Sequence, residues 1–452
     1  MVQPPLVSQL NSTSVPEDFK TEALNLQDSN QNAILQNTIL NYDLVIVGGG
    51  IVGATLAVAL EGSGLTVLIV EAQKKAEAIA KGQAYAIHLS SSRIWDALGV
   101  WAAIEPQVQE FKQVHLSDGT DHHVVQFMPQ DLGQDLGLSS LGHVAEHRVL
   151  LSALLDRVQR CKNIHWCCPA RVAQTKVQGD YTELTVESLD AEAISDNPPF
   201  TVRSRLVIGA DGAKSQVREQ VGIKTRGKAY WQSCLVATIQ PEKAHRNIAY
   251  ERFWPSGPFA ILPVSETHCR IVWTAPHAEA QRLQALNEQD FSVALTERYG
   301  TQMGQLTLVG DRFTFPAKLV HSCEYVRPRV ALVGDAAHSC HPVGGQGLNL
   351  GVRDAAALAQ ILRTAQIQGE DIGSLAVLKR YQRWRRTQNI LALSFTDILN
   401  RMFSNQILPL VVVRRLGLRL MSMIPWIKVT SLRFMAGLLG KAPLLLPPTP
   451  SK

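Results

Sequence analysis

Residues 42–53 read YDLVIVGGGIVG, an apolar run that ends in closely spaced glycines. The run lacks polar alternation, which is typical of a parallel strand that is buried on both faces. Gly48, Gly50 and Gly53 match the pattern G-x-G-x-x-G. In that pattern the first glycine allows a tight turn, the second lets a pyrophosphate approach the backbone, and the third lets a helix pack closely on the sheet.

An acidic residue completes this pattern. The next apolar run, residues 66–70, ends at Glu71, which lies 18 residues beyond Gly53. A carboxylate at the end of the second strand commonly binds a ribose hydroxyl of a dinucleotide. The order of strand, glycines, helix, strand and acid therefore predicts a dinucleotide-binding unit. A tight strand-to-helix turn without a ligand remains the alternative.

A second glycine-rich stretch, residues 334–351, reads GDAAHSCHPVGGQGLNLG. It follows an apolar strand pattern at 329–333, so Asp335 is expected at a strand end, where a buried carboxylate needs a donor or a ligand. The loop 342–347 holds three glycines, which let backbone N–H groups approach a flat ring. The helix expected from about Leu348 directs its positive end at the same place. Because a reduced flavin carries negative charge at its pyrimidine edge, this stretch predicts a flavin site.

The composition is that of an ordinary globular protein. The chain has 452 residues, 46% of them apolar and 18% charged, so it can bury a large core and is expected to hold two interleaved domains. Its seven cysteines are odd in number and scattered, which favours a reducing, cytoplasmic compartment over a disulfide framework. Residues 1–40 are rich in Asn, Gln and Ser, lack the pattern of a secretory signal, and are expected to form a flexible leader.

The positive charge is concentrated near the C-terminal end. The net charge is +5, but residues 398–452 hold eight basic residues and no acidic one, which leaves 36 basic and 39 acidic residues elsewhere. Because this tail is also apolar, it suits a membrane surface better than a nucleic acid. Arg414 and Arg415 interrupt its longest apolar run, short of the roughly 20 residues that a spanning helix needs. Peripheral membrane binding and a basic helix packed on the body remain open alternatives.

Residues 205–218 read RLVIGADGAKSQVR, a strand pattern followed by an Asp-Gly turn and a basic helix start. The turn at 211–212, with Ser215 and Arg218, resembles the DG motif of the class A flavoprotein aromatic hydroxylases, and the Gly-Asp pair that opens the second glycine-rich stretch resembles their GD motif. These enzymes bind FAD in a Rossmann-like unit and take NAD(P)H only transiently. By this resemblance Asp211 is a cofactor-binding residue that, with Arg218, orders the turn and steers the reductant. An Asx turn made by Asp211 alone is the alternative.

Other stretches resemble a narrower branch, the ubiquinone-biosynthesis hydroxylases, which includes the 2-octaprenylphenol and 2-octaprenyl-6-methoxyphenol hydroxylases. The stretches that carry this resemblance are GHVAEHRVLLSAL (142–154), ERFWPSGPFAILPV (251–264), GGQGLNLGVRDAAALA (344–359) and YQRWRR (381–386). Two positions depart from the pattern. Gln83 stands where many relatives have an arginine near the flavin, so a permanent charge is lost there, and His147 stands where an asparagine is more usual.

The resemblance implies an α/β fold in which a Rossmann-like FAD-binding domain of the aromatic hydroxylase type is interleaved with a β-sheet substrate domain. A helical C-terminal region, interrupted by Pro409 and Pro425, is expected to follow. The expected segments are 41–115, 141–220 and 312–395 for FAD binding, 116–140 and 221–311 for the substrate domain, and 396–452 for the helical region.

Four aromatic residues of the substrate segments are candidates for the wall of a pocket over the flavin. They are Phe253, Trp254, Phe259 and Trp273. Aromatic side chains in a sheet also pack in the core, and this is the alternative.

The resemblance also implies the reaction. FAD, reduced by NAD(P)H as a transient co-substrate, would react with O2 to give a flavin C4a-hydroperoxide that hydroxylates an electron-rich, prenylated phenol in quinone biosynthesis. The flavin carries this chemistry, so no catalytic side chain is expected, and the protein positions the substrate and excludes water. Two alternatives keep the fold. One is an epoxidase or prenyl-chain reductase, and the other is a non-catalytic flavoprotein that joins a membrane-associated biosynthetic complex through its basic tail.

The resemblance assigns most of the cofactor contacts. The residues expected at the ADP half of FAD are Gly48, Gly50, Gly53 and Glu71, and those expected at the isoalloxazine ring are Gly345, Gln346, Gly347, Leu348 and Asn349. Asp335 is expected to bind the ribityl hydroxyls. Arg148 is expected near the phosphates or the ribityl chain, and an ion pair with Glu146 is the alternative.

A metal site is not expected. His338, Cys340 and His341 lie close together, but structural zinc sites draw on two separated ligand pairs, and no C-x-x-C pair accompanies these residues. The chain also lacks a P-loop and a Gly-x-Ser-x-Gly elbow, so the usual signatures of kinases and hydrolases are missing.

Overall fold

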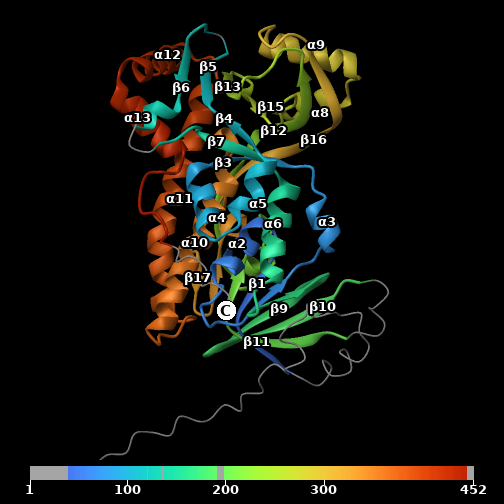
Figure 1. Cartoon of the computed structure of the whole chain (residues 1–452), viewed down its shortest axis with the longest axis vertical. Coiled ribbons are helices and arrows are strands. Elements are labelled where there is room, and N and C mark those ends of the chain that lie inside the picture. The colour runs from blue at the N-terminus through green and yellow to red at the C-terminus, as the bar shows by residue number, and fades with distance from the viewer. Residues whose placement is uncertain (1–38, 120, 134–136, 191–197, 445–452) are drawn as a thin grey trace, which may run out of the picture.

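A mostly parallel sheet forms the lower part of the described structure in Figure 1. The structure is a computed structural model that describes residues 39–119, 121–133, 137–190 and 198–444, so the predicted leader lies almost wholly outside the described residues. The strands run in the order β17-β18-β11-β1-β2-β8, with β10 and β9 added as an antiparallel pair beside β11. Their bounds are β1 (Leu40–Val47), β2 (Val67–Val70), β8 (Ile164–Cys167), β9 (Ala170–Gln178), β10 (Tyr181–Ser188), β11 (Phe200–Gly209), β17 (Val326–Arg327) and β18 (Val330–Leu332).

Helices cover this first sheet because its central strands are apolar on both faces. Val45 and Ile46 of β1, for example, are completely buried. Helix α2 packs against both α6 and α10. The helices of this part are α2 (Ile51–Ala59), α3 (Lys75–Ile79), α4 (Leu89–Ala97), α5 (Trp101–Ile104), α6 (His147–Gln159), α7 (Gln216–Gln220) and α10 (Gln346–Ile367). Parallel strands with helices packed on them confirm the predicted Rossmann-like fold.

A second sheet lies above the first in Figure 1 and is mostly antiparallel, in the order β19-β16-β12-β15-β14-β13-β5-β6. The one parallel pair among these described strands joins β13 to β5. The strands are β5 (Gln113–Asp118), β6 (Val124–Phe127), β12 (Thr225–Pro241), β13 (Ile248–Trp254), β14 (Gly257–Pro263), β15 (Cys269–Pro276), β16 (Leu306–Ser322) and β19 (His338–Ser339). Helices α8 (His277–Ala285) and α9 (Glu288–Tyr299) pack on one face of this sheet.

The predicted aromatic pocket wall is wrong, because none of these four aromatic residues lines the cavity described below. Phe259 and Trp273 are cross-strand partners that pack in a core with Phe291 of α9. Phe253 stacks on Phe403 with ring centroids 4.2 Å apart. Since side chains alternate between the two faces of a strand, the residues next to these aromatics point to the other face.

The predicted domain boundary at residue 312 falls inside β16, which continues to Ser322. This strand pairs with β12 along nearly its whole length, from Leu306 opposite Pro241 to Ser322 opposite Thr225. The second sheet therefore reaches further along the chain than the predicted substrate segment, and its last part pairs with the short β19, which follows the Gly-Asp pair at 334–335.

A three-stranded sheet lies between the two larger ones in Figure 1. Its strands are β3 (Ala84–His88), β4 (Gln109–Phe111) and β7 (Gly142–Glu146), with β7 paired to both others. Short 3₁₀ turns complete the described elements: η2 (Glu105–Gln107), η3 (Pro129–Leu132), η5 (Gly334–Ala336) and η6 (Val343–Gly345).

Three helices form the C-terminal region, α11 (Leu375–Phe403), α12 (Leu408–Met423) and α13 (Pro425–Met435). Pro409 and Pro425 stand in the first turns of α12 and α13, where the missing N–H costs nothing. Basic side chains tie these helices to the body. Arg414 pairs with Asp118 at 2.8 Å and Lys428 with Asp131 at 2.8 Å. The tail is thus packed on the body, one of the two alternatives.

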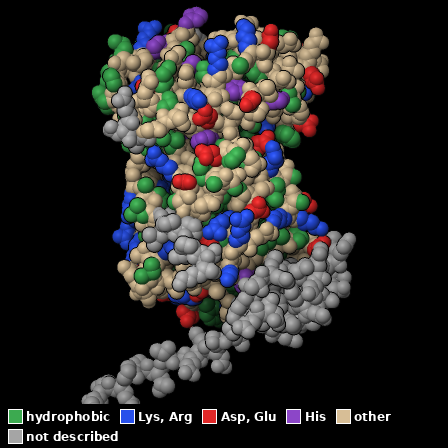
Figure 2. All heavy atoms as spheres, in the orientation of Figure 1, with side chains coloured by type: hydrophobic (Ala, Val, Ile, Leu, Met, Phe, Trp, Pro, Cys, Tyr) green, Lys and Arg blue, Asp and Glu red, His purple; other side chains and the backbone are tan. Residues whose placement is uncertain are grey.

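The outer face of α12 is nevertheless apolar. Figure 2 shows apolar side chains on the surface at the upper left, where Figure 1 places α12 and α13. Leu408, Val412, Leu416 and Met423 are 54–77% exposed and recur along one side of the helix. No helix within the described ranges is long and apolar enough to cross a membrane.

Candidate active site

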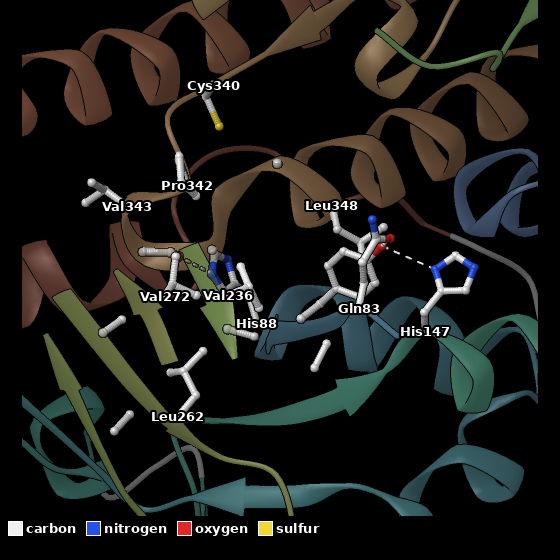
Figure 3. Close-up of a pocket in the computed structure, with 18 of the residues that line it drawn as sticks. Gln83, His88, His147, Val236, Leu262, Val272, Cys340, Pro342, Val343 and Leu348 are labelled. Atoms are coloured by element: carbon white, nitrogen blue, oxygen red, sulfur yellow. Dashed lines mark hydrogen bonds between the residues drawn. The ribbon is translucent and has the colours of Figure 1, made fainter. Parts of the chain in front are cut away.

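A cavity of about 860 Å³ lies between the first and second sheets. One side is built from the second sheet, and Figure 3 shows Val236, Leu262 and Val272 pointing from it into the cavity. The opposite side is the loop that carries Cys340 and Pro342. The G-x-G-x-x-G loop also opens into this space, so the cavity joins the predicted dinucleotide and flavin segments.

Of the three glycines in the G-x-G-x-x-G pattern, two pack against neighbouring backbone and one faces the cavity. Gly48 has φ +106°, and a Cβ there would lie 2.4 Å from the carbonyl oxygen of Ala210. A Cβ on Gly53 would lie 2.0 Å from the carbonyl oxygen of Gly48. A Cβ on Gly50 would meet no described atom within 4 Å. Only Gly50 therefore leaves open backbone where a phosphate could approach.

Helix α2 begins at this open backbone, and the backbone N–H groups of its first turn are available to a ligand. Its N-cap is Gly50, and no side chain of the described residues caps the helix. Gly50, Ile51 and Val52 line the cavity. Uncapped N–H groups and the helix dipole together favour an anion at this point, as a pyrophosphate requires.

Glu71 directly follows strand β2 and stabilises the G-x-G-x-x-G turn. Its carboxylate accepts hydrogen bonds from the backbone N–H groups of Gly49 at 2.7 Å and Gln73 at 2.9 Å. Each carboxylate oxygen keeps a further lone pair. Ribose binding by Glu71 stays a prediction, and the structure adds a role in fixing the turn.

Asp335 is directed into the cavity. It follows β18 in the short turn η5, and its side chain lines the cavity without a hydrogen bond or ion pair to any residue that the structure describes. Desolvation raises the pKa of Asp335, against the opposing effect of His338. A carboxylate without a partner on the protein is suited to accept hydrogen bonds from a ligand.

Helix α10 is the second helix whose N-terminus opens at the cavity. Gly345 is its N-cap, in the left-handed conformation at φ +61°, and a Cβ there would lie 2.9 Å from Cβ of Ala86. Gly345, Gly347 and Leu348 line the cavity. The loop thus offers exposed backbone and a helix N-terminus, the arrangement predicted for a flavin ring.

Two residues predicted at the ring direct their side chains elsewhere. The Asn349 amide donates to the carbonyl oxygens of Gly345 and Ala86, at 2.7 and 2.8 Å, and accepts from the backbone N–H of His88 at 2.9 Å. Gln346 is buried and directs its amide at Met435 of α13. Both are outside the cavity lining, so a ring contact by these two would have to use the backbone.

Hydrogen bonds from the DG motif hold the backbone that follows the GD motif. The Asp211 carboxylate accepts from the backbone N–H of Val217 at 3.1 Å, at the start of α7. Arg218 is buried and donates to the carbonyl oxygens of Ala336 at 2.9 Å and Ala213 at 3.0 Å. These bonds order the turn, as predicted for both residues. Steering of a reductant stays a prediction.

Arg148 forms an ion pair with Glu146, which was the alternative to cofactor binding. Its Nε lies 2.6 Å from the Glu146 carboxylate, and the side chain is 64% exposed and outside the cavity lining. The neighbouring His147 does line the cavity, because the two side chains at the start of α6 point in different directions. The structure therefore offers no support for Arg148 as a cofactor ligand.

Gln83, noted above as a departure, belongs to a hydrogen-bonded chain that the sequence did not reveal. Tyr85 donates to Gln83 at 2.7 Å and lies 3.2 Å from Nδ1 of His147, and His147 Nε2 lies 3.0 Å from the carbonyl oxygen of Ala78. All three side chains line the cavity. Burial, and secondarily Asp335, raise the pKa of Tyr85. This chain gives the cavity a neutral polar edge near the position where relatives have an arginine.

A buried acid, also missed from the sequence, anchors the GD turn. Asp354 of α10 accepts from Arg385 at 2.7 Å, Asn389 at 2.9 Å and the backbone N–H of Gly334 at 3.2 Å, and its other contact is His338 at 2.5 Å. Burial would raise the pKa of Asp354, but His338 and Arg385 outweigh it and lower the pKa. An acid inside the apolar run VRDAAALA was the available signal.

The His-Cys-His group separates in space. His338 contacts Asp354, Cys340 lines the cavity, and the His341 ring packs edge-on against Tyr230 with centroids 5.0 Å apart. In the part of the chain that the structure covers, no three His, Cys, Asp or Glu side chains are grouped to hold a metal ion.

Comparisons with known proteins agree with this geometry. A family model described as FAD binding domain matches residues 41–395. The chain is 45% identical over 404 residues to an uncharacterized protein of Synechocystis sp., covering 89% of this chain and 95% of that protein. It is 38% identical over 379 residues to the ubiquinone hydroxylase UbiL of Rhodospirillum rubrum, covering 83% of this chain and 85% of UbiL. The p-nitrophenol 4-monooxygenase PnpA of Pseudomonas putida shares the fold, with a TM-score of 0.72 over 88% of this chain and 99% of that chain at 18% identity.

Proposed function

The chain belongs to the FAD-dependent hydroxylases of ubiquinone biosynthesis, and we propose that it uses NAD(P)H and O2 to hydroxylate an electron-rich, prenylated phenol in quinone biosynthesis. FAD would supply the activation of oxygen. The chain's own residues bind the cofactor, orient the phenol and exclude water. The proposed cofactor residues are those whose backbone or carboxylate opens on the cavity: Gly50, Asp335, Gly345, Gly347 and Leu348.

The observation that carries this proposal is the apolar wall opposite the flavin loop. Val236, Leu262 and Val272 of the second sheet face the loop across the cavity (Figure 3). Such a wall excludes water and offers dispersion contacts to an aromatic ring. Both properties suit an oxygen transfer, because water in the site would lead to unproductive side reactions.

A prenyl chain requires an apolar route, and we propose that this route runs along the C-terminal helices. Leu432, Met435 and Ala436, within or directly after α13, line the cavity. Helix α12 packs beside α13 and carries the exposed apolar stripe Leu408, Val412, Leu416 and Met423. We therefore include attachment of α12 to a membrane surface in the proposal, through its exposed apolar stripe.

The proposed reaction is tested with purified, FAD-loaded protein, 2-farnesylphenol as the probe, and either NADH or NADPH under ¹⁸O2. The expected result is a product one oxygen atom heavier that carries the label, with NAD(P)H consumed in equal amount. Product without label, or reduction of the prenyl chain in the absence of oxygen, would contradict the proposal and favour the reductase alternative. A flavin that neither nicotinamide reduces would favour a non-catalytic component of a biosynthetic complex.

A further inference from the structure

One acidic residue stands in the apolar wall. Cross-strand pairing sets Val236 of β12, Val272 of β15, Ala260 of β14 and Glu251 of β13 in one row. All four line the cavity. Because paired residues in a pleated sheet point to the same face, the Glu251 carboxylate points into the cavity together with three apolar side chains.

Glu251 has no partner among the described side chains. Among the residues that the structure describes, Glu251 makes no hydrogen bond and no ion pair, and burial raises its pKa to about 8. A buried polar group without a partner is costly, so its presence in a cavity indicates that a ligand supplies the missing contact.

The side chains around Glu251 do not take over this role. The adjacent strands β14 and β5 present Ala260 and Leu116 at the paired positions. On β12, burial raises the pKa of the Cys234 thiol to about 12, so the thiol is neutral. On β15, Thr274 is uncharged, and Arg270 stands further along, opposite Leu262. Among the described residues of the second sheet that line the cavity, Glu251 is therefore the one acid.

The opposite side of the cavity has a different chemistry. The titratable side chains that line it there are Lys81, Tyr85, His88, His147, Asp335 and Cys340. They come from the segments assigned to FAD. Glu251 and Asp335 are thus two carboxylates on opposite walls, one above the space for a substrate ring and one at the predicted ribityl site.

We propose that Glu251 binds the phenol hydroxyl of the substrate and accepts its proton during hydroxylation, an inference that rests on the proposed function. The phenol O–H bond breaks, its electron pair stays on the oxygen, and the proton forms an O–H bond to the carboxylate. The phenolate donates electron density to the ring, whose neighbouring carbon forms the bond to oxygen, with O2 as oxidant and NAD(P)H as reductant. When aromaticity returns, the hydrogen on that carbon leaves as a proton, and Glu251 returns its proton to the phenolate oxygen. The second oxygen atom of O2 leaves as water, which takes up the proton released from the carbon.

This assignment explains recognition as well as rate. Apolar contacts discriminate weakly between a phenol and its methyl ether, whereas a buried group that must be hydrogen-bonded rejects the ligand that leaves it unpaired. Glu251 also supplies a proton acceptor, and its pKa lies nearer to the pKa of a phenol than the pKa of an exposed carboxylate does.

The test separates binding from chemistry. Binding of 2-farnesylphenol and of its methyl ether to the oxidised holoenzyme is followed by the change in flavin absorbance, for wild type, Glu251→Leu, Glu251→Gln and the control Glu266→Gln, an exposed acid in the β14–β15 turn. We expect wild type and control to prefer the phenol about 10-fold, and Glu251→Leu to bind both equally. An unchanged preference in Glu251→Leu would overturn the proposal.

Single-turnover product formation is measured on the same proteins. Glu251→Gln can still hydrogen-bond the phenol but cannot take its proton, so product formation should fall about 100-fold with little loss of phenol binding. Ionised Glu251 is the active form, so the wild-type rate should rise as the pH passes about 8, and the variant should lack this rise. Equal rates in variant and wild type would overturn the proton-transfer role. If wild type binds the phenol selectively but forms no product, the proposed function fails while the binding role of Glu251 stands.

Discussion

At the scale of single residues, Gly48 and Gly50 face opposite constraints although only one residue separates them. We expect Gly50→Val to fold with nearly unchanged Tm but to lose FAD at least 10-fold, because its side chain would occupy open space on the cavity side. Gly48→Val should fail to fold stably, since its φ of +106° and the 2.4 Å approach to Ala210 exclude a Cβ. The ratio of flavin to protein absorbance and thermal unfolding measure the two effects. Stoichiometric FAD in Gly50→Val would contradict the assignment.

Asp335 gives a second residue-scale prediction. Asp335→Asn keeps the shape but removes the charge, so the protein without flavin should be as stable as wild type or more stable, because the carboxylate makes no hydrogen bond or ion pair with a described residue that the substitution would break. FAD affinity should fall at least 10-fold, measured by equilibrium dialysis. The matched control is Asp311→Asn, an exposed acid of β16, which should bind FAD like wild type. Normal affinity in Asp335→Asn would remove this residue from the cofactor site.

Local patterns predicted positions better than side-chain directions. The order of glycines and acids sufficed to bring Gly50, Asp335 and Gly347 to one cavity, because each sits where a strand ends or a helix begins. The direction of the Asn349 side chain depends on β3, more than 250 residues earlier in the chain, whose backbone it binds. Such a contact leaves no periodicity in the sequence, and the same is true of the Tyr85–His147 contact.

At the scale of elements, one buried ion pair fixes α12 to the second sheet. Arg414 and Asp118 are 1% and 0% exposed, and Arg415 stands 3.6 Å from the same carboxylate. Arg414→Met should destabilise the protein by about 3 kcal/mol, the lower end for breaking a buried pair, because Arg415 still faces Asp118. Denaturant unfolding measures this loss, and limited proteolysis should cut first near α12. The control Arg419→Met lies on the exposed side of the same helix and should change stability little.

The double variant Asp118→Asn with Arg414→Met sharpens this prediction. It removes both buried charges, so it should recover most of the lost stability. A double variant that is less stable than Arg414→Met alone would show that the pair is not what holds α12.

Element boundaries were the less predictable part of the fold. The resemblance placed the end of the substrate segments at 311, yet β16 passes through Gly310 with only a shift in its pairing to β12. A strand of this length is held by its partner rather than by its own signals. Pro409 and Pro425 were predictable, since each was expected to interrupt the helical region and a new helix begins at or beside each of them.

At the scale of the whole molecule, the cavity exists only because two sheets meet over it. The first sheet contributes open backbone and Asp335, the second contributes the apolar wall with Glu251, and α13 contributes Leu432 and Met435. Segments from all parts of the described chain are therefore needed for one site. The fold class followed from the sequence because its motifs are local, whereas the wall depends on which face of each strand turns inward.

The position of α13 changes how membrane attachment should be tested. Removing residues 398–452 would also remove part of the cavity wall, so surface substitutions are cleaner. We expect Leu408→Ser, Val412→Ser and Leu416→Ser together to lower binding to vesicles with anionic lipid at least 10-fold, because each exposed apolar side chain contributes on the order of 1 kcal/mol when it enters the interface. Vesicle sedimentation measures the bound fraction.

The control variant changes three exposed apolar residues elsewhere, Val177, Val293 and Ile367, to serine. It should sediment with vesicles like wild type if the α12 stripe is the attachment surface. Binding of wild type should also weaken as salt rises, since the exposed Arg419 of α12 contributes through screened attraction to headgroups. Equal sedimentation of the stripe variant and wild type would show that α12 faces something other than lipid, and the prenyl chain would then need another route into the cavity.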